Sequence, residues 1–95
     1  MLGETKLASY EEMVNGNFSQ KVATARSVIE SAELTGARYR VVAYYGTQPV
    51  RGTNYLFIAE QTLTTAKIER HLVKLAVNEF QGEFTLVGKS IERID

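Results

Sequence analysis

The spacing of apolar residues along this chain changes twice, and each period predicts a different kind of element. Residues 1–16 show no sustained period, which predicts an extended arm. From residue 17 apolar side chains recur every three or four positions, which predicts one amphipathic helix over residues 17–35. Its apolar stripe consists of Phe18, Val22, Ala25, Ile29 and Ala32.

Both ends of the predicted helix carry residues that are typical of helix termini. Asn17 can accept the free amides of the first turn, and Gln20 can reach back to it. Gly36 can adopt the left-handed conformation that often follows the last helical turn. These residues predict a helix that fills the whole interval between them.

After Gly36 the period becomes two, which predicts β-strands. The runs ARYRVVAYYGT and TNYLFIAEQTLT are both rich in aromatic and β-branched residues. The stretch QPVRG, Gln48 to Gly52, lies between them and closes a hairpin. Its length predicts a longer loop, in which Pro49 owes no amide to the sheet. One face carries Tyr39, Val41, Ala43 and Tyr45, then Tyr55, Phe57, Ala59 and Leu63, and Tyr44 falls on the other face.

The segment from Thr65 to Phe80 fits either period, so spacing alone does not decide between a helix and a strand. We interpret it as a strand with Val73, Leu75 and Val77 on one face. The stretch FQGE, residues 80–83, then connects it to a last strand in EFTLVGKSIERI and makes a second hairpin.

These elements predict a single α+β domain over residues 1–95. One long helix packs on a four-stranded antiparallel sheet, a meander over residues 37–95. The arm can add a short N-terminal strand to that sheet.

Composition and charge exclude several classes of function. Eleven basic and eleven acidic residues cancel, so no overall field draws the chain to nucleic acid or to an anionic membrane. The chain contains no cysteine, which excludes disulfides and thiolate chemistry. The start, MLGETKLASY, lacks the features of a secretory signal, so a cytoplasmic protein is expected, or a secreted one if a leader has been removed.

Candidate chemistry is sparse. His71 is the only histidine, and no nucleophile motif, phosphate-binding loop or metal-ligand spacing is present in the sequence. We therefore expect no enzymatic activity, metal or cofactor, and a structural or surface role for His71. Arg38 and Arg40 near Tyr44 could form a stacking platform for nucleic acid, but Glu60 falls on a strand that could be a neighbour. Two arginines on a solvent face are more often only a polar face, so no nucleic-acid partner is expected.

The tip of the first hairpin leaves two interpretations open. Val50 can point into water with Arg51 free to meet a partner, since binding residues concentrate on loops of a rigid sheet. Alternatively, Val50 folds back on the sheet and Arg51 is merely solvated.

QPVRGTNY resembles the first inhibitory loop of the cystatin superfamily, whose pattern is Q-x-V-x-G, commonly continued as TNY. Gln48, Val50 and Gly52 match this pattern. The likeness covers most of the chain in order, with a glycine near the N-terminus (Gly3), one long helix and two hairpins, and it implies a strand over Glu69 to Phe80. The absence of cysteine makes the stefin type the closer likeness, because secreted cystatins carry disulfides.

The resemblance implies reversible, competitive inhibition of papain-like cysteine proteases, such as papain and the cathepsins. The arm would occupy the non-primed subsites, the first loop would enter the cleft beside the catalytic cysteine, and the second loop would lie on the primed side. The protease-binding residues implied in this way are Leu2, Gly3, Gln48, Pro49, Val50, Arg51, Gly52, Phe80, Gln81 and Gly82.

Three departures from the cystatin pattern bear on this function. The FQGE loop has neither the Pro-Trp of secreted cystatins nor the Leu-Pro of stefins, so Phe80 would supply its apolar contact and Glu83 could repel an acidic rim. Arg51 places a charge where cystatins often have a small residue, and few residues precede Gly3. We expect inhibition that is weaker or more selective than that of a typical stefin. The alternative is a cystatin-fold interaction module that inhibits no protease.

The chain is expected to be a monomer. The strands that flank QPVRG would become one long strand if the turn straightened, and exchange of a hairpin between two chains would then give a domain-swapped dimer.

Overall fold

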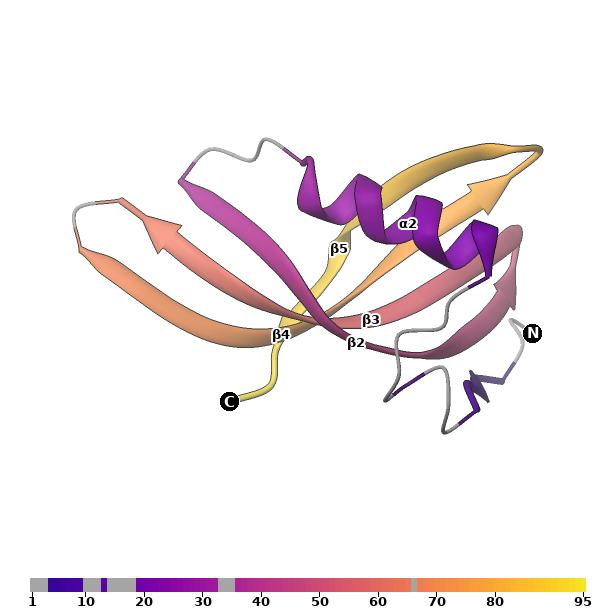
Figure 1. Ribbon diagram of the computed structural model, residues 1–95, viewed down its shortest axis with the longest axis horizontal. Coiled ribbons are helices and arrows are strands. Elements are labelled where there is room, and N and C mark those ends of the chain that lie inside the picture. The colour runs from indigo at the N-terminus through magenta and orange to yellow at the C-terminus, as the bar shows by residue number, and fades with distance from the viewer. Residues whose placement is uncertain (1–3, 10–12, 14–18, 33–35, 66) are drawn as a thin grey trace.

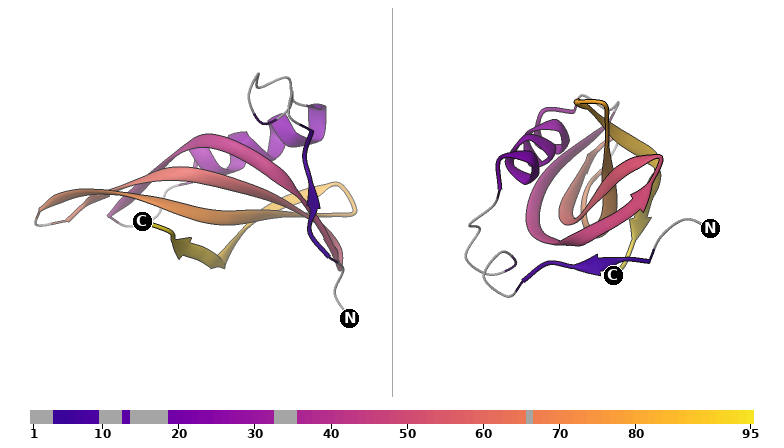
Figure 2. Two further views of the ribbon diagram at one scale, coloured as in Figure 1. Left: turned by 90° about the horizontal axis from the view of Figure 1, so that it is seen from below. Right: turned by 90° about the vertical axis from the view of Figure 1, so that its right-hand side faces the viewer.

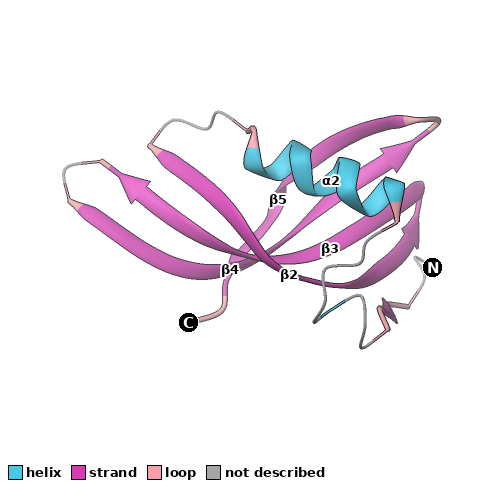
Figure 3. Cartoon of the chain, viewed as in Figure 1, coloured by secondary structure: helices cyan, strands magenta, loops and turns pink. Residues whose placement is uncertain are grey.

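The computed structural model describes residues 4–9, 13, 19–32, 36–65 and 67–95. It confirms an α+β arrangement in which helix α2 (Gln20–Glu30) lies on one side of a five-stranded antiparallel sheet (Figures 1 and 3). The strands follow one another in the sheet as they do in the chain. They are β1 (Lys6–Leu7), β2 (Ala37–Val50), β3 (Gly52–Thr64), β4 (Ile68–Phe80) and β5 (Glu83–Arg93).

Two expectations about the sheet are confirmed. The segment with two competing periods is strand β4, and the arm supplies the short strand β1 at the edge of β2. The four strands from β2 to β5 form the predicted meander, so each central pairing joins elements that are adjacent in sequence. Figure 2 shows how long and strongly twisted these strands are.

Helix α2 is shorter than the predicted interval of residues 17–35. Its N-cap is Ser19, whose hydroxyl accepts a hydrogen bond from the amide of Val22 at 3.4 Å, and its C-cap is Ser31. Asn17, the predicted cap, lies outside the described residues. The prediction of the start was wrong because serine and asparagine cap a helix about equally well, and the apolar period does not choose between them.

Gly36 has the left-handed conformation that was predicted, with φ of 76°, but it does not end the helix. Its carbonyl accepts a hydrogen bond from the amide of Thr64 at 2.8 Å. Gly36 therefore positions the chain for the start of β2 beside the end of β3.

The hydrophobic core lies between α2 and one face of the three central strands. Phe57 is its largest fully buried side chain, and its ring centre is 5.3 Å from that of Tyr44. The helix contributes the predicted residues Val22, Ala25 and Ile29. The strands contribute Tyr39, Val41, Tyr44, Tyr55, Phe57, Ala59, Val73, Leu75 and Val77.

Two β-bulges in β2 overturn part of the predicted face assignment. The register with β3 shifts between Val41 and Ala43, and again between Tyr44 and Gly46. A bulge places an extra residue in one strand, so the inward and outward positions exchange beyond it. Tyr44 therefore packs in the core, where Tyr45 had been expected, and Val42 is exposed on the opposite face.

Within the residues that the structure describes, no helix is both long enough and apolar enough to cross a membrane.

Candidate functional site

The tip of the first hairpin is tighter than predicted. β2 continues through Pro49, which pairs with Thr53, and Val50 pairs with Gly52, so only Arg51 lies outside the ladder. The expected longer loop is wrong because Gly52 has φ of 84°, a conformation that reverses the chain without a β-carbon in the way. Gln48, Pro49 and Val50 therefore end β2, Gly52 begins β3, and Arg51 alone forms the turn between them.

The residues of this tip differ in exposure. Val50 is partly buried, whereas Pro49 and Arg51 are exposed. The side chains that a partner would meet first are therefore those of the two variable positions of the Q-x-V-x-G pattern.

The backbone of the first tip is fastened to β4. A β-carbon on Gly52 would lie 2.2 Å from the carbonyl oxygen of Glu79, so only glycine allows this approach. The side-chain amide of Asn78 donates to the carbonyl oxygen of Arg51 at 3.1 Å and to the side-chain oxygen of Asn54 at 3.0 Å. These contacts hold the turn in one place relative to β4.

The second tip is a two-residue turn that also needs unusual backbone angles. Gln81 and Gly82 have φ of 52° and 85°, the positive values that a type I′ hairpin turn requires at both positions. The Glu79 carboxylate accepts a hydrogen bond from the Gly82 amide at 3.0 Å and lies 3.5 Å from Lys21 Nζ of helix α2. Glu79 therefore joins this turn to the helix.

The two tips lie side by side at one end of the molecule, the right-hand end in Figure 1. The guanidinium carbon of Arg51 is 5.1 Å from the centre of the Phe80 ring, a cation–π distance. Phe80 is 36% exposed, so the ring remains accessible beside the arginine. The structure thus brings together two segments that are nearly thirty residues apart in the chain.

The arm approaches the same end from the side of β2. Lys6 pairs with Thr47 and Leu7 with Gly46, and the pairing is antiparallel, so residues 4 and 5 lie on the Gln48 side of Lys6. A β-carbon on Gly46 would lie 2.1 Å from the carbonyl oxygen of Lys6, which makes this glycine necessary for the pairing as well. Leu2 and Gly3, which were assigned to the site from the sequence, lie outside the described residues.

Sequence reasoning missed Asn78 and Glu79, which hold the two tips in place. Their contacts depend on the register between β3 and β4, which pairs Asn54 with Asn78 and Thr53 with Glu79. The roles of Asn78 and Glu79 beside the turns could therefore be recognised only when this register was known.

Tyr44 cannot take part in the platform considered for nucleic acid, because its ring is buried in the core. Arg40 lies 3.6 Å from the carboxylate of Glu60 on the neighbouring strand. Arg40 therefore forms an ion pair across β2 and β3, as is common for charged residues on the solvent face of a sheet.

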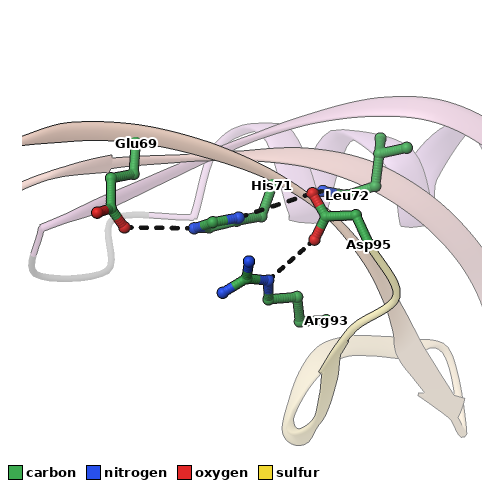
Figure 4. Close-up of polar contacts among 5 residues, drawn as sticks. All are labelled: Glu69, His71, Leu72, Arg93 and Asp95. Carbon is green, nitrogen blue, oxygen red and sulfur yellow. Dashed lines mark hydrogen bonds and ion pairs between the residues drawn. The ribbon is translucent and has the colours of Figure 1, made fainter.

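His71 belongs to a separate polar cluster at the far end of the sheet (Figure 4). Its ring, 13% exposed, lies between two carboxylates, with Nε2 3.4 Å from Glu69 and Nδ1 3.6 Å from Asp95. Asp95 also accepts hydrogen bonds from the amide of Leu72 at 3.1 Å and from Arg93 Nε at 2.9 Å. The cluster attaches the chain after β5 to β4, which is a structural role for His71.

The hydrogen bond from the Leu72 amide, with the nearby Arg93 guanidinium, lowers the pKa of Asp95 below its usual range. The folded state therefore favours the ionised carboxylate, and this contribution to stability is present above the ordinary pKa and is lost as the pH falls through the folded value. We expect the free energy of unfolding of the native protein to exceed that of Asp95→Asn most clearly above about pH 5 and to approach it below about pH 3.

Urea unfolding of both proteins across this pH range checks the expectation. Glu92→Gln is the control, since Glu92 is an exposed acid on β5 whose described contact is an ion pair with Lys74 at 3.6 Å. A difference between native protein and Asp95→Asn that stays constant from pH 7 to pH 2.5 would contradict the role given to the ionised carboxylate.

In the described part of the chain, no group of three or more histidine, cysteine, aspartate or glutamate side chains is placed to hold a metal ion. Comparisons with protein-family models, with curated proteins and with solved structures returned no match for this chain.

Proposed function

We propose that this protein is a reversible, competitive inhibitor of papain-like cysteine proteases, of the cystatin type and closest to the disulfide-free stefins. One observation carries the proposal: the Q-x-V-x-G turn and the Phe80 turn form a joined, exposed end of the sheet. The described part of the arm runs toward that end. In this proposal the protein acts as a cytoplasmic monomer, with no catalytic residue, metal or cofactor of its own.

The geometry suits a wedge that fills a cleft without being cleaved. At the first tip the chain reverses at a single residue, Arg51, and the residues on either side of it are paired in the ladder. A protease needs an extended peptide with its carbonyl against the nucleophile, and a chain already paired on both sides of a tight turn does not present one. Resistance to cleavage therefore follows from the hairpin itself.

The same rigidity supports tight binding. The Arg51 carbonyl is held by Asn78, and the second turn is held by Glu79, so little freedom remains to be lost when the tips enter a cleft. Surfaces that are already ordered lose less entropy on association, which lets a modest interface bind tightly.

Substitution of Val50 by aspartate tests the proposal. We expect the native protein to inhibit papain and a cathepsin L-type enzyme reversibly, and Val50→Asp to inhibit about 30-fold more weakly, since an unpaired charge would be buried against the cleft. The measurement is a titration with a fluorogenic substrate, made on protein purified as a monomer.

Ile68→Asp is the matched control, because Ile68 is 69% exposed at the opposite end of the β3–β4 hairpin. It introduces the same charge and should leave inhibition unchanged. If the native protein and both variants are folded and none inhibits either enzyme, protease inhibition is wrong. The tips would then belong to an interaction module of the same fold.

A further inference from the structure

Arg51 differs from Glu79, its charged neighbour at the tips, in forming no ion pair within the residues that the structure describes. Glu79 is neutralised by Lys21 and bonded to the Gly82 amide. In the described part of the chain, by contrast, the Arg51 guanidinium forms no ion pair. Its cationic group is exposed at the outermost point of the first tip with its charge uncompensated.

The position of this charge is determined by the fold. Asn78 holds the Arg51 carbonyl, and Gly52 sits against the Glu79 carbonyl, so the backbone on both sides is fixed. The Phe80 ring supports the guanidinium at 5.1 Å. A guanidinium over a ring keeps N–H groups free for a carboxylate, and it loses less rotamer freedom on binding than an unsupported arginine.

A second charge makes the two tips different from each other. Glu83 pairs with Phe80 across the second turn and is exposed. The joined end of the sheet therefore presents a cation on the first tip, an aromatic ring beside it and an anion beyond the ring. A partner that fits all three groups must carry a negative charge on the side of the first tip only.

We infer that Arg51 is a specificity-determining residue of the proposed inhibitor. It selects papain-like proteases that present a carboxylate at the rim of the cleft where the first tip enters, next to an apolar contact for Phe80. This inference rests on the proposed function. A rim charge acts mainly on association and on the choice between partners, because a like charge opposite it is unfavourable while a carboxylate forms a paired, directional contact.

The test compares one papain-like protease that carries carboxylates at the cleft rim with its own variant in which those carboxylates are replaced by amides. We expect the native inhibitor to bind the acidic-rim enzyme about tenfold more tightly than the amide variant, and Arg51→Glu to abolish or reverse this preference. Arg51→Lys keeps the charge but lacks the planar guanidinium that can bind a carboxylate through two N–H groups, so it should retain part of the preference.

Two further measurements make the test specific. The association rate of the native inhibitor with the acidic-rim enzyme should fall as salt is added, and that of Arg51→Gln should change little. Phe80→Leu keeps an apolar side chain but removes the ring that supports the guanidinium, so it should reduce the preference without reversing it. Circular dichroism and urea unfolding should show native-like folding for all variants, because the substituted side chains are exposed.

The outcomes separate this inference from the function on which it rests. Equal inhibition of both enzymes by the native protein, or equal losses on both enzymes for Arg51→Glu, would overturn the role of Arg51 and leave the proposed inhibition standing. Failure of the native protein to inhibit either enzyme would overturn the proposed function, and the inference with it.

Discussion

Phe57→Ala is expected to lower the free energy of unfolding by about 3–5 kcal/mol, the usual cost of removing a buried aromatic ring. Phe57 is 0% exposed in the middle of β3, with the ring of Tyr44 on one neighbouring strand and Leu75 on the other. The strands on both sides are held by their ladders, so they cannot move inward to fill the cavity. The loss should therefore lie in the upper part of this range.

Urea unfolding followed by circular dichroism measures the loss, and Phe80→Ala serves as control. Phe80 is the same kind of residue but is 36% exposed on the second tip, so its replacement should cost at most about 1 kcal/mol. Comparable losses for the two variants would mean that the core is not centred on Phe57.

Gly52→Ala is expected to cost about 3 kcal/mol, from two sources that add. An L-residue with φ near 84° costs roughly 1–2 kcal/mol, and the new β-carbon would stand 2.2 Å from the carbonyl oxygen of Glu79. That oxygen belongs to the backbone of β4, so it can give way only if β3 and β4 separate near the tips. Separation would also move Arg51 away from Phe80, and we expect inhibition to weaken together with stability.

Gly82→Ala isolates the first source, the conformational cost, so the difference between the two variants gives the cost of the close contact. Gly82 has nearly the same φ, 85°, but nothing lies within 4 Å of the position that its β-carbon would take. It should therefore show only the conformational cost of about 1–2 kcal/mol. Unfolding curves that coincide for the two variants would exclude a close contact between Gly52 and β4.

Alternation predicted β3, whereas the segment of β4 fitted either period and was interpreted as a strand; where the register of these strands is unbroken, the predicted faces are correct. β3 and β4 pair without interruption from Thr53 with Glu79 to Thr64 with Ile68, and the inward faces predicted for both strands are correct at the core. The prediction failed in the middle of β2, because a bulge adds a residue without leaving a mark in the hydrophobic pattern. The start of α2 could not be predicted because Asn17 and Ser19 are equivalent as candidate caps.

The segments of the candidate site could be predicted, and the likeness to cystatins implied that they enter one cleft, but the contacts between them could not be predicted. The motif identified Gln48–Gly52, and the likeness to cystatins identified Phe80–Gly82, yet neither indicated that the segments touch. Their contact depends on how far β4 extends beside the first tip, and this is a property of the strand register. Arg51 on Phe80 and Asn78 on the Arg51 carbonyl follow from that register.

Each of the two bulges adds one residue to β2. The strand could lose these two residues without a change in which side chains face the core. If Val42 were deleted, Val41 and Ala43 would occupy successive positions opposite Ala59 and Ile58, and every face would be retained. What would be lost is the bend and extra twist that a bulge introduces. The surplus length of β2 over its partner therefore encodes the curvature of the sheet, and with it the angle at which the two tips are presented.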